Sequence, residues 1–225
     1  MTLKPAVMLF AAGRGTRMAP LTDERPKPMV EVAGKPLVDH ALGLVRQAGL
    51  DRVVANTHYL PTRLETHLHL AGVQTIRETE LLETGGGLRN ALPLLGDGPV
   101  ITLNSDAVWA GGNPISELLD AWQPDEMDAL LTLIHPDSAV GHDGAGDFSV
   151  SDTGRLTRAP GFVYTGAQIM KPERLFDISD NVFSLNRVWD LIQAERRLFG
   201  VIFQGAWCDV GQPASIPMAE ALLNV

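Results

Sequence analysis

The sequence predicts an α/β protein with a Rossmann-like, three-layer α/β/α fold and a mainly parallel mixed central sheet. Short, continuously apolar segments alternate with segments of helical periodicity through the first half of the chain, which is typical of parallel strands joined by crossover helices. Two of the apolar segments lead directly into glycine or aspartate, at residues 11–15 and 104–106. Because ligands bind such sheets beyond the carboxyl ends of the strands, we expect the functional site there.

The first half of the chain supplies most of the parallel strands. Residues 6–10 are apolar throughout and are followed by glycines, which is typical of a strand buried on both faces. Pro36 and Gly49 bound a helix-periodic stretch, as expected for proline in the first turn and glycine just past the end. Further expected elements are strands at 52–56, 73–76 and 100–103, a helix from Pro61, a glycine turn at 85–87 and a helix at 88–95.

The second half is less regular and contains no internal repeat or linker. We expect it to extend the same sheet and to cover the site, with the polar, glycine-rich residues 135–146 as a mobile cover. The expected elements are helices at 115–122 and 185–195, strands at 129–134, 148–150, 161–170 and 198–204, and a short terminal helix.

Composition narrows the class of protein. A chain of 225 residues with 45% hydrophobic content can bury one sizeable core, and a net charge of −9 argues against a nucleic-acid partner. No segment approaches the roughly 20 apolar residues of a membrane helix, and the start of the chain lacks a signal-peptide profile. We therefore expect a cytoplasmic protein without a membrane partner. The single cysteine, Cys208, cannot form an intrachain disulfide.

Residues 11–18, A-A-G-R-G-T-R-M, form a glycine-rich basic segment after the first expected strand. The dinucleotide motif GxGxxG requires a third glycine where this chain has Met18, and the P-loop motif has no match. Backbone N–H groups of small residues can nevertheless face phosphate oxygens at close range, although an ordinary turn stays open at this point. Lys27 follows between two prolines, so we expect it on a stiff, extended backbone suited to holding a fixed phosphate.

The motifs A-A-G-x-G-T-R-M, P-L-T, P-K-P and, further along, N-S-D resemble the signature of the sugar-1-phosphate nucleotidylyltransferase family. Members join a nucleoside triphosphate to a sugar 1-phosphate and release pyrophosphate. The resemblance spans nearly the whole chain and implies one domain over residues 1–225. Residues 1–110 would then bind the nucleotide and residues 111–225 the sugar phosphate.

The resemblance also implies roles for individual residues. The catalytic residues would be Arg17, Lys27 and Asp106. Nucleotide-binding residues would be Ala11, Ala12, Gly13, Gly15, Thr16, Arg17, Asn56, Glu83, Thr84, Gly85 and Asn104. Sugar-phosphate-binding residues would be Lys27, Gly146, Asp147, Thr165 and Gly166. Asp106 and Asp209 would bind Mg²⁺, which often takes one or two carboxylates plus substrate phosphates.

The substrates are implied by a finer resemblance. The segment L-E-T-G-G-G at residues 82–87, with N-T-H-Y-L at 56–60 and G-D-F at 146–148, most resembles the N-acetylmuramate-1-phosphate uridylyltransferases of cell-wall recycling. Guanylyltransferases acting on mannose or heptose 1-phosphate stay open, as does a non-catalytic nucleotide-sugar sensor. Many relatives carry a sugar-binding glutamate where this chain has the segment R-A-P-G at residues 158–161. Monomer and homodimer are both open.

Histidine pairs offer weaker signals. His67 and His69 lie two residues apart, and such positions on a helix do not face each other. A second group, with flexible spacing, is typical of a solvated loop, and it comprises His135, Asp137, His142 and Asp143. We therefore expect no metal site at either place.

Overall fold

The structure is a computed structural model that describes residues 4–224. Its central seven-stranded sheet has the order β13-β8-β12-β6-β1-β4-β5. The strands are β1 (Ala6–Phe10), β4 (Val53–Thr57), β5 (Gln74–Arg77), β6 (Val100–Asn104), β8 (Ala129–Ile134), β12 (Val163–Met170) and β13 (Leu198–Ile202). Neighbouring strands are parallel except where β12 runs antiparallel to β6 and β8. The predicted mainly parallel mixed sheet is confirmed.

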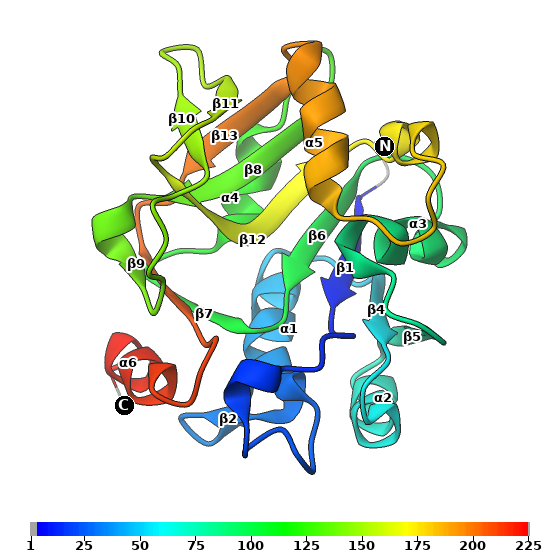
Figure 1. Cartoon of the computed structure of the whole chain (residues 1–225), viewed down its shortest axis with the longest axis vertical. Coiled ribbons are helices and arrows are strands. Elements are labelled where there is room, and N and C mark those ends of the chain that lie inside the picture. The colour runs from blue at the N-terminus through cyan, green and yellow to red at the C-terminus, as the bar shows by residue number, and fades with distance from the viewer. Residues whose placement is uncertain (1–3, 225) are drawn as a thin grey trace.

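Helices cover both faces of this sheet (Figure 1). One face packs against α1 (Leu37–Gln47), α2 (Pro61–Leu70) and α4 (Pro114–Ala121), and the other against α3 (Glu83–Leu95) and α5 (Leu185–Ala194). Leu42, Leu64 and Leu118 share one buried cluster with the strands, whereas Leu88 and Val188 belong to a second. The three-layer prediction is therefore confirmed. Among residues 4–224 no helix has the length and apolar character needed to cross a membrane.

A smaller sheet, which the sequence did not predict, lies beside the carboxyl edge of the large one. Its order is β7-β14-β9, with β7 (Ala107–Ala110), β14 (Ala206–Asp209) and β9 (Ala139–Val140), and α6 (Ser215–Leu222) packs on it. Figure 1 shows β7 and α6 at the edge toward which β1 and β6 point. Cys208 is fully buried here, and burial raises the pKa of its thiol to about 11. The small sheet thus brings the end of the chain to the glycine loop.

The remaining short elements connect and cap the sheets. They are the 3₁₀ helices η1 (Thr16–Met18), η2 (Lys27–Met29), η3 (Pro136–Ser138) and η4 (Glu173–Asp177), and the strands β2 (Glu31–Val32), β3 (Lys35–Pro36), β10 (Phe148–Val150) and β11 (Leu156–Arg158). The expected extended backbone at Lys27 is wrong, because Lys27 opens η2 and the extended residue is Pro26. A hydrogen bond of 2.9 Å from Val30 N to Lys27 O closes this turn. The turn buries the Lys27 side chain instead of projecting it into solvent.

The expected glycine turn at residues 85–87 is also wrong, because α3 begins at Glu83 and contains all three glycines. The reason is a close tertiary contact. A Cβ on Gly86 would lie 2.2 Å from the carbonyl oxygen of Asn181, and one on Gly85 would lie 2.4 Å from the Phe183 ring. Glycine is needed here for close approach of another segment rather than for a turn.

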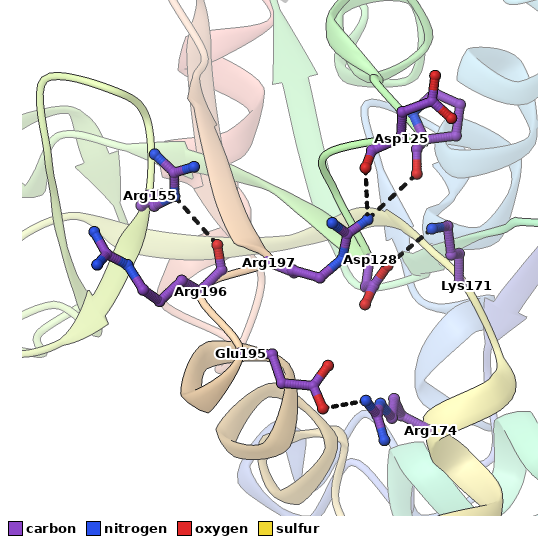
Figure 2. A network of polar contacts seen from close by, with 9 residues as sticks. Asp125, Asp128, Arg155, Lys171, Arg174, Glu195, Arg196 and Arg197 are labelled. Atoms are coloured by element: carbon purple, nitrogen blue, oxygen red, sulfur yellow. Dashed lines mark hydrogen bonds and ion pairs between the residues drawn. The ribbon is translucent and has the colours of Figure 1, made fainter.

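At the edge of the large sheet opposite its carboxyl edge, charged side chains connect neighbouring strands (Figure 2). Asp128 precedes β8, Lys171 follows β12 and Arg197 precedes β13. The Asp128 carboxylate accepts hydrogen bonds from Lys171 Nζ at 2.8 Å and from Arg197 Nε at 2.9 Å. Burial by itself would raise the pKa of the Asp128 carboxyl, but the bonds from Lys171 and Arg197 together hold that pKa below its usual value.

We expect Asp128→Asn to lower the free energy of unfolding by about 2 kcal/mol, because hydrogen bonds to charged groups contribute about 1.5–3 kcal/mol each. Since the pKa is lowered in the folded state, this stabilisation is complete above about pH 4 and is lost as the pH falls through the folded-state pKa. Urea unfolding of wild type and variant from pH 7 to pH 3 measures both effects. The control Asp152→Asn removes an exposed carboxylate and should change stability by less than about 0.5 kcal/mol. Equal stability of the two variants at pH 7 would contradict the assignment.

Candidate active site

The site begins where β1 and β6 end side by side. Ser105 Oγ donates a hydrogen bond of 2.6 Å to Phe10 O, which ties the two strand ends together. Ala11, which follows Phe10, donates its N–H to Asn56 Oδ1 at 2.9 Å, near the end of β4. The glycine loop therefore leaves the sheet from a fixed point between three parallel strands.

The far end of the glycine loop is held against Lys27. Gly15 has a φ of +63°, and a Cβ there would lie 2.7 Å from Lys27 Cβ, so this position requires glycine both for its backbone and for space. Thr22 Oγ1 donates to Gly15 O at 2.9 Å, and Tyr59 donates its hydroxyl to Thr22 O at 3.0 Å. In contrast, a Cβ on Gly13 would have no neighbour within 4 Å. The middle of the loop is consequently open while both of its ends are fixed.

Lys27 points from η2 to the end of β6. Its ammonium group forms an ion pair of 2.8 Å with Asp106 Oδ2, across a sequence separation of 79 residues. The lysine side chain is only 10% exposed, whereas that of Asp106 is 32% exposed. The buried Lys27 ammonium group is therefore well placed to release the accessible Asp106 carboxylate and to bind an incoming phosphate oxygen instead.

The small sheet brings a second carboxylate to Asp106. In the antiparallel pairing of β14 with β7, Asp209 lies opposite Ala107, and Val210 N donates to Asp106 O at 3.0 Å. Burial raises the pKa of Asp209, and the negative charge of Asp106 raises it further, while Lys27 and Arg17 partly oppose the shift. The two predicted magnesium ligands thus lie together, and their repulsion is the kind that a divalent cation relieves.

A cavity of about 300 Å³ lies over these strand ends. Nine of the residues predicted to bind the nucleotide or to act in catalysis line it, and they are Ala11, Ala12, Gly13, Lys27, Asn56, Glu83, Thr84, Asn104 and Asp106. Of the other predicted residues in these two classes, Gly15 packs on Lys27 and Gly85 packs on Phe183. Thr16 and Arg17 belong to η1.

Arg17 lines a second cavity of about 280 Å³, together with Asp209. Gly211 lies against both charged groups. A Cβ on it would be 2.9 Å from Asp209 Oδ2 and 3.3 Å from Arg17 Nη1. The predicted catalytic residues and magnesium ligands are therefore divided between two cavities. Lys27 and Asp106 line the first, and Arg17 and Asp209 the second.

The start of α3 forms the far wall of the first cavity. Glu83 has a φ of +59°, an uncommon backbone conformation for a residue with a side chain. Gly85 and Gly86 donate their N–H groups to Phe183 O at 2.9 and 3.0 Å, and Thr84 Oγ1 accepts the N–H of Leu185 at 3.0 Å. The two helices thereby cap each other, which fixes this wall. A contact between the Thr84 hydroxyl and a base stays a prediction.

Sequence reasoning missed Glu78, which lies just after β5 and is only 4% exposed. Its Oε1 accepts from Asn56 Nδ2 at 2.7 Å, its Oε2 accepts from Leu82 N at 3.2 Å, and it lines the first cavity. Glu78 therefore joins the anchor of the glycine loop to the segment before α3. Its position after a parallel strand is the signal that could have found it.

Glu78→Gln is expected to raise the KM for the nucleoside triphosphate about tenfold, with a smaller effect on kcat. An amide presents one acceptor in place of two, so either the Asn56 or the Leu82 hydrogen bond is lost. A buried group left unpaired costs about 1–3 kcal/mol, and about 1.4 kcal/mol corresponds to a factor of ten. Initial rates at varied nucleotide measure the change. Glu80→Gln, at an exposed neighbouring position, is the matched control, and an equal KM for both variants would contradict the role given to Glu78.

Apart from Lys27, the residues predicted to bind the sugar phosphate lie around an irregularity in β12. The register of β12 with β8 shifts between Tyr164 and Gln168. Asp147 Oδ2 accepts the N–H of Tyr164 at 2.8 Å, and the Thr165 hydroxyl is buried and donates to Thr132 O at 2.7 Å.

Two glycines at this irregularity allow close backbone contacts. Gly146 and Gly166 both have positive φ and lie against Gly161 and Asn104, respectively. Both are positions at which a Cβ would clash. The contacts to the sugar stay predictions.

Arg158, the first residue of the R-A-P-G segment, makes its contacts within the protein itself. Its guanidinium lies over the Phe148 and Trp189 rings and donates to Asp190 Oδ1 at 3.2 Å and to Asn186 O at 3.2 Å. These contacts join β11 to α5.

Comparison with known proteins agrees with this geometry. The profile of the MobA-like NTP transferase domain matches residues 7–142. The N-acetylmuramate alpha-1-phosphate uridylyltransferase of Caulobacter vibrioides is 39% identical to the chain over 96% of both proteins. Mannose-1-phosphate guanylyltransferase 1 of Arabidopsis thaliana is 28% identical over 92% of the chain and 61% of that protein. The solved inositol-1-phosphate CTP transferase of T. maritima superposes with a TM-score of 0.81 at 18% identity, covering 98% of this chain and 95% of that one.

A fixed glycine loop, the buried Lys27 and the carboxylates of Asp106 and Asp209 lie at the carboxyl edge of the large sheet, where ligands bind in α/β folds. The chain belongs to the MobA-like NTP transferase family, among its sugar-phosphate nucleotidyltransferases. The resemblance stated from the sequence motifs is thereby confirmed.

Proposed function

We propose that this protein transfers uridylyl from UTP to N-acetylmuramic acid 1-phosphate, forming a UDP-sugar and releasing diphosphate. The observation that carries the reaction class is the meeting of Lys27, Asp106 and Asp209 beside the glycine loop. The choice of substrates is supported by the 39% identity to an N-acetylmuramate uridylyltransferase over nearly full length, against 28% to a guanylyltransferase.

The proposed chemistry requires no covalent intermediate. An oxygen of the sugar phosphate forms a bond to the α-phosphorus of UTP, and the bond from that phosphorus to the bridging oxygen of the β-phosphate breaks. Diphosphate leaves with the electron pair. Because two anions must approach each other, positioning and charge neutralisation should supply most of the catalysis.

Each part of the site has a place in this scheme. The base enters the cavity bounded by Glu83 and Thr84, and the phosphates lie on the open middle of the glycine loop near Gly13. Lys27 exchanges Asp106 for oxygens of the α-phosphate and of the attacking sugar phosphate. Its burial holds the ammonium group in one place, so the charge is already positioned when the phosphates meet.

Asp106 and Asp209 fit a magnesium site. Among residues 4–224 no three His, Cys, Asp or Glu side chains lie close enough together to hold a metal ion. The support for Mg²⁺ comes instead from the two adjacent carboxylates, because Mg²⁺ prefers oxygen ligands and completes its shell with water and substrate phosphates. When bound, Mg²⁺ would neutralise charge on the transferring phosphate. The raised pKa of Asp209 beside Asp106 is consistent with two anions held ready for a cation.

The proposal also assigns a substrate to each half of the chain and a cellular compartment to the reaction. Residues 1–110 bind the nucleotide and residues 111–225 the sugar phosphate, within one domain. Since N-acetylmuramic acid is a cell-wall sugar and UTP is a cytoplasmic metabolite, the enzyme would act in the cytoplasm in cell-wall recycling.

A coupled diphosphate-release assay tests the proposed function. The purified protein is supplied with Mg²⁺, each of the four ribonucleoside triphosphates or dTTP, and the 1-phosphates of N-acetylmuramic acid, mannose, heptose or N-acetylglucosamine. We expect the highest kcat/KM for UTP with N-acetylmuramic acid 1-phosphate. Turnover with no pair, alongside tight binding of a nucleotide sugar, would instead identify a non-catalytic sensor.

A further inference from the structure

The small sheet brings a third chemically active residue to the two aspartates. β9 pairs in parallel with β14, so that Val140 lies opposite Cys208, and the chain then continues to His142. Gly141 has a φ of +74°, and a Cβ on it would lie 2.4 Å from Asp209 O. This contact turns residues 141–144 over the end of β14. His142, Asp209 and Asp106 therefore arise from three distant segments and lie at one end of the same sheet.

His142 lines the cavity that contains Arg17 and Asp209. The Asp143 carboxylate lines it as well. The lining thus combines one guanidinium with two carboxylates, and an N–H donated by His142 would add to what Arg17 can offer an anionic ligand.

Buried polar atoms without a protein partner gather around this segment. In residues 4–224 there are four such side-chain atoms, and three of them are His142 Nε2, Trp207 Nε1 and Ser215 Oγ. The His142 ring lies 6.5 Å from the Trp207 ring, and Ser215 Oγ would be 3.2 Å from a Cβ on Gly141. A buried polar group without a partner costs about 1–3 kcal/mol and calls for an explanation. A ligand in the neighbouring cavity would supply one for His142.

Gly144 is the residue that covers the ring. A Cβ on Gly144 would lie 2.3 Å from His142 Nε2, so the backbone of Gly144 passes close to this nitrogen. The His142 ring nevertheless lines the cavity that contains Arg17 and Asp209, where a ligand can reach it.

We propose that His142 is a phosphate-binding residue of the reaction centre, donating an imidazole N–H to a phosphoryl oxygen that Arg17 holds in the same cavity. The inference rests on the proposed function, because that reaction brings phosphate to this cavity. The oxygen belongs either to the diphosphate that leaves or to the phosphate of the acceptor sugar. Arg17 follows the triphosphate loop, which favours the diphosphate.

Calorimetric titration with magnesium diphosphate, and separately with N-acetylmuramic acid 1-phosphate, tests the inference without requiring turnover. The proteins are wild type, His142→Ala, His142→Gln and the control His135→Ala, which removes an exposed histidine from the same loop region. We expect His142→Ala to bind one of the two ligands about tenfold more weakly, and His142→Gln, which keeps an N–H donor, to recover part of the loss. Weakened diphosphate binding assigns the leaving group, and weakened sugar-phosphate binding assigns the acceptor.

The result that would overturn the inference is equal affinity of wild type, His142→Ala and His135→Ala for both ligands, or no binding of either ligand by wild type. Thermal unfolding of each variant separates a folding defect from a binding defect, because the glutamine variant should recover affinity without a change in melting temperature. A wild type that turns over no substrate pair but binds diphosphate through His142 would contradict the proposed function and leave this inference standing.

Discussion

Lys27→Met should lower kcat for nucleotidyl transfer by about 10²- to 10³-fold, the usual effect of removing one preorganised electrostatic contact to a transition state. The ammonium group of Lys27 is buried and lies 2.8 Å from Asp106, and Lys27 lines the first cavity. Methionine keeps most of the apolar stem, so the packing against Gly15 and the η2 turn should survive. Diphosphate release under saturating substrates measures the loss.

Lys35→Ala is the matched control, because Lys35 is an exposed lysine on β3. It should retain near wild-type kcat. If Lys27→Met also keeps more than about half of the wild-type kcat while folding normally, then Lys27 does not touch the reacting phosphates.

Asp106→Asn and Asp209→Asn should each lower turnover by about 10³-fold, equivalent to about 4 kcal/mol of transition-state stabilisation. Each change removes one anionic oxygen ligand at nearly constant volume. Because the two carboxylates act as a unit, the double variant should lose little more than either single variant. Initial rates at several magnesium concentrations measure these losses, and the single variants should need more Mg²⁺ for half-maximal rate.

Asp209→Asn should also make the metal-free protein more resistant to heat. The pKa of Asp209 is raised in the folded state by burial and by Asp106, so its ionised form destabilises the fold at neutral pH and asparagine removes that cost. Thermal unfolding in EDTA at pH 7 measures the effect. Asp152→Asn, which removes an exposed carboxylate that lines neither cavity, is the control for both activity and stability. A variant that is inactive because it is unfolded would contradict the account.

The sequence predicted most of the large sheet because its signals are local. Residues 6–10 and 100–103 are short apolar runs whose ends carry glycine or aspartate, and both proved to be parallel strands with the site beyond them. Pro36 and Pro61 stood at or just before the start of a helix, as expected. Such signals depend on each segment alone, so one sequence suffices to read them.

The small sheet could not be predicted in the same way. β7 and β14 pair across about 100 residues, and β9 has only two residues, so no periodicity within one segment reports the register. The proximity of Asp106 to Asp209 was expected only from the family resemblance. The proximity of His142 to Asp209 was missed. The glycines of α3 were misread for a similar reason, because their need for space comes from Asn181 and Phe183, about 95 residues away.

The central claim is that this site transfers uridylyl to an N-acetylmuramic acid 1-phosphate acceptor, and a one-pot competition tests it most directly. UTP, GTP, CTP, ATP and dTTP are mixed at equal concentration with N-acetylmuramic acid 1-phosphate, Mg²⁺ and limiting enzyme, and the nucleotide sugars are identified by mass spectrometry. We predict that UDP-N-acetylmuramic acid is the dominant product. A GDP-sugar as the dominant product, or no nucleotide sugar from a folded, magnesium-supplied protein, would contradict the claim.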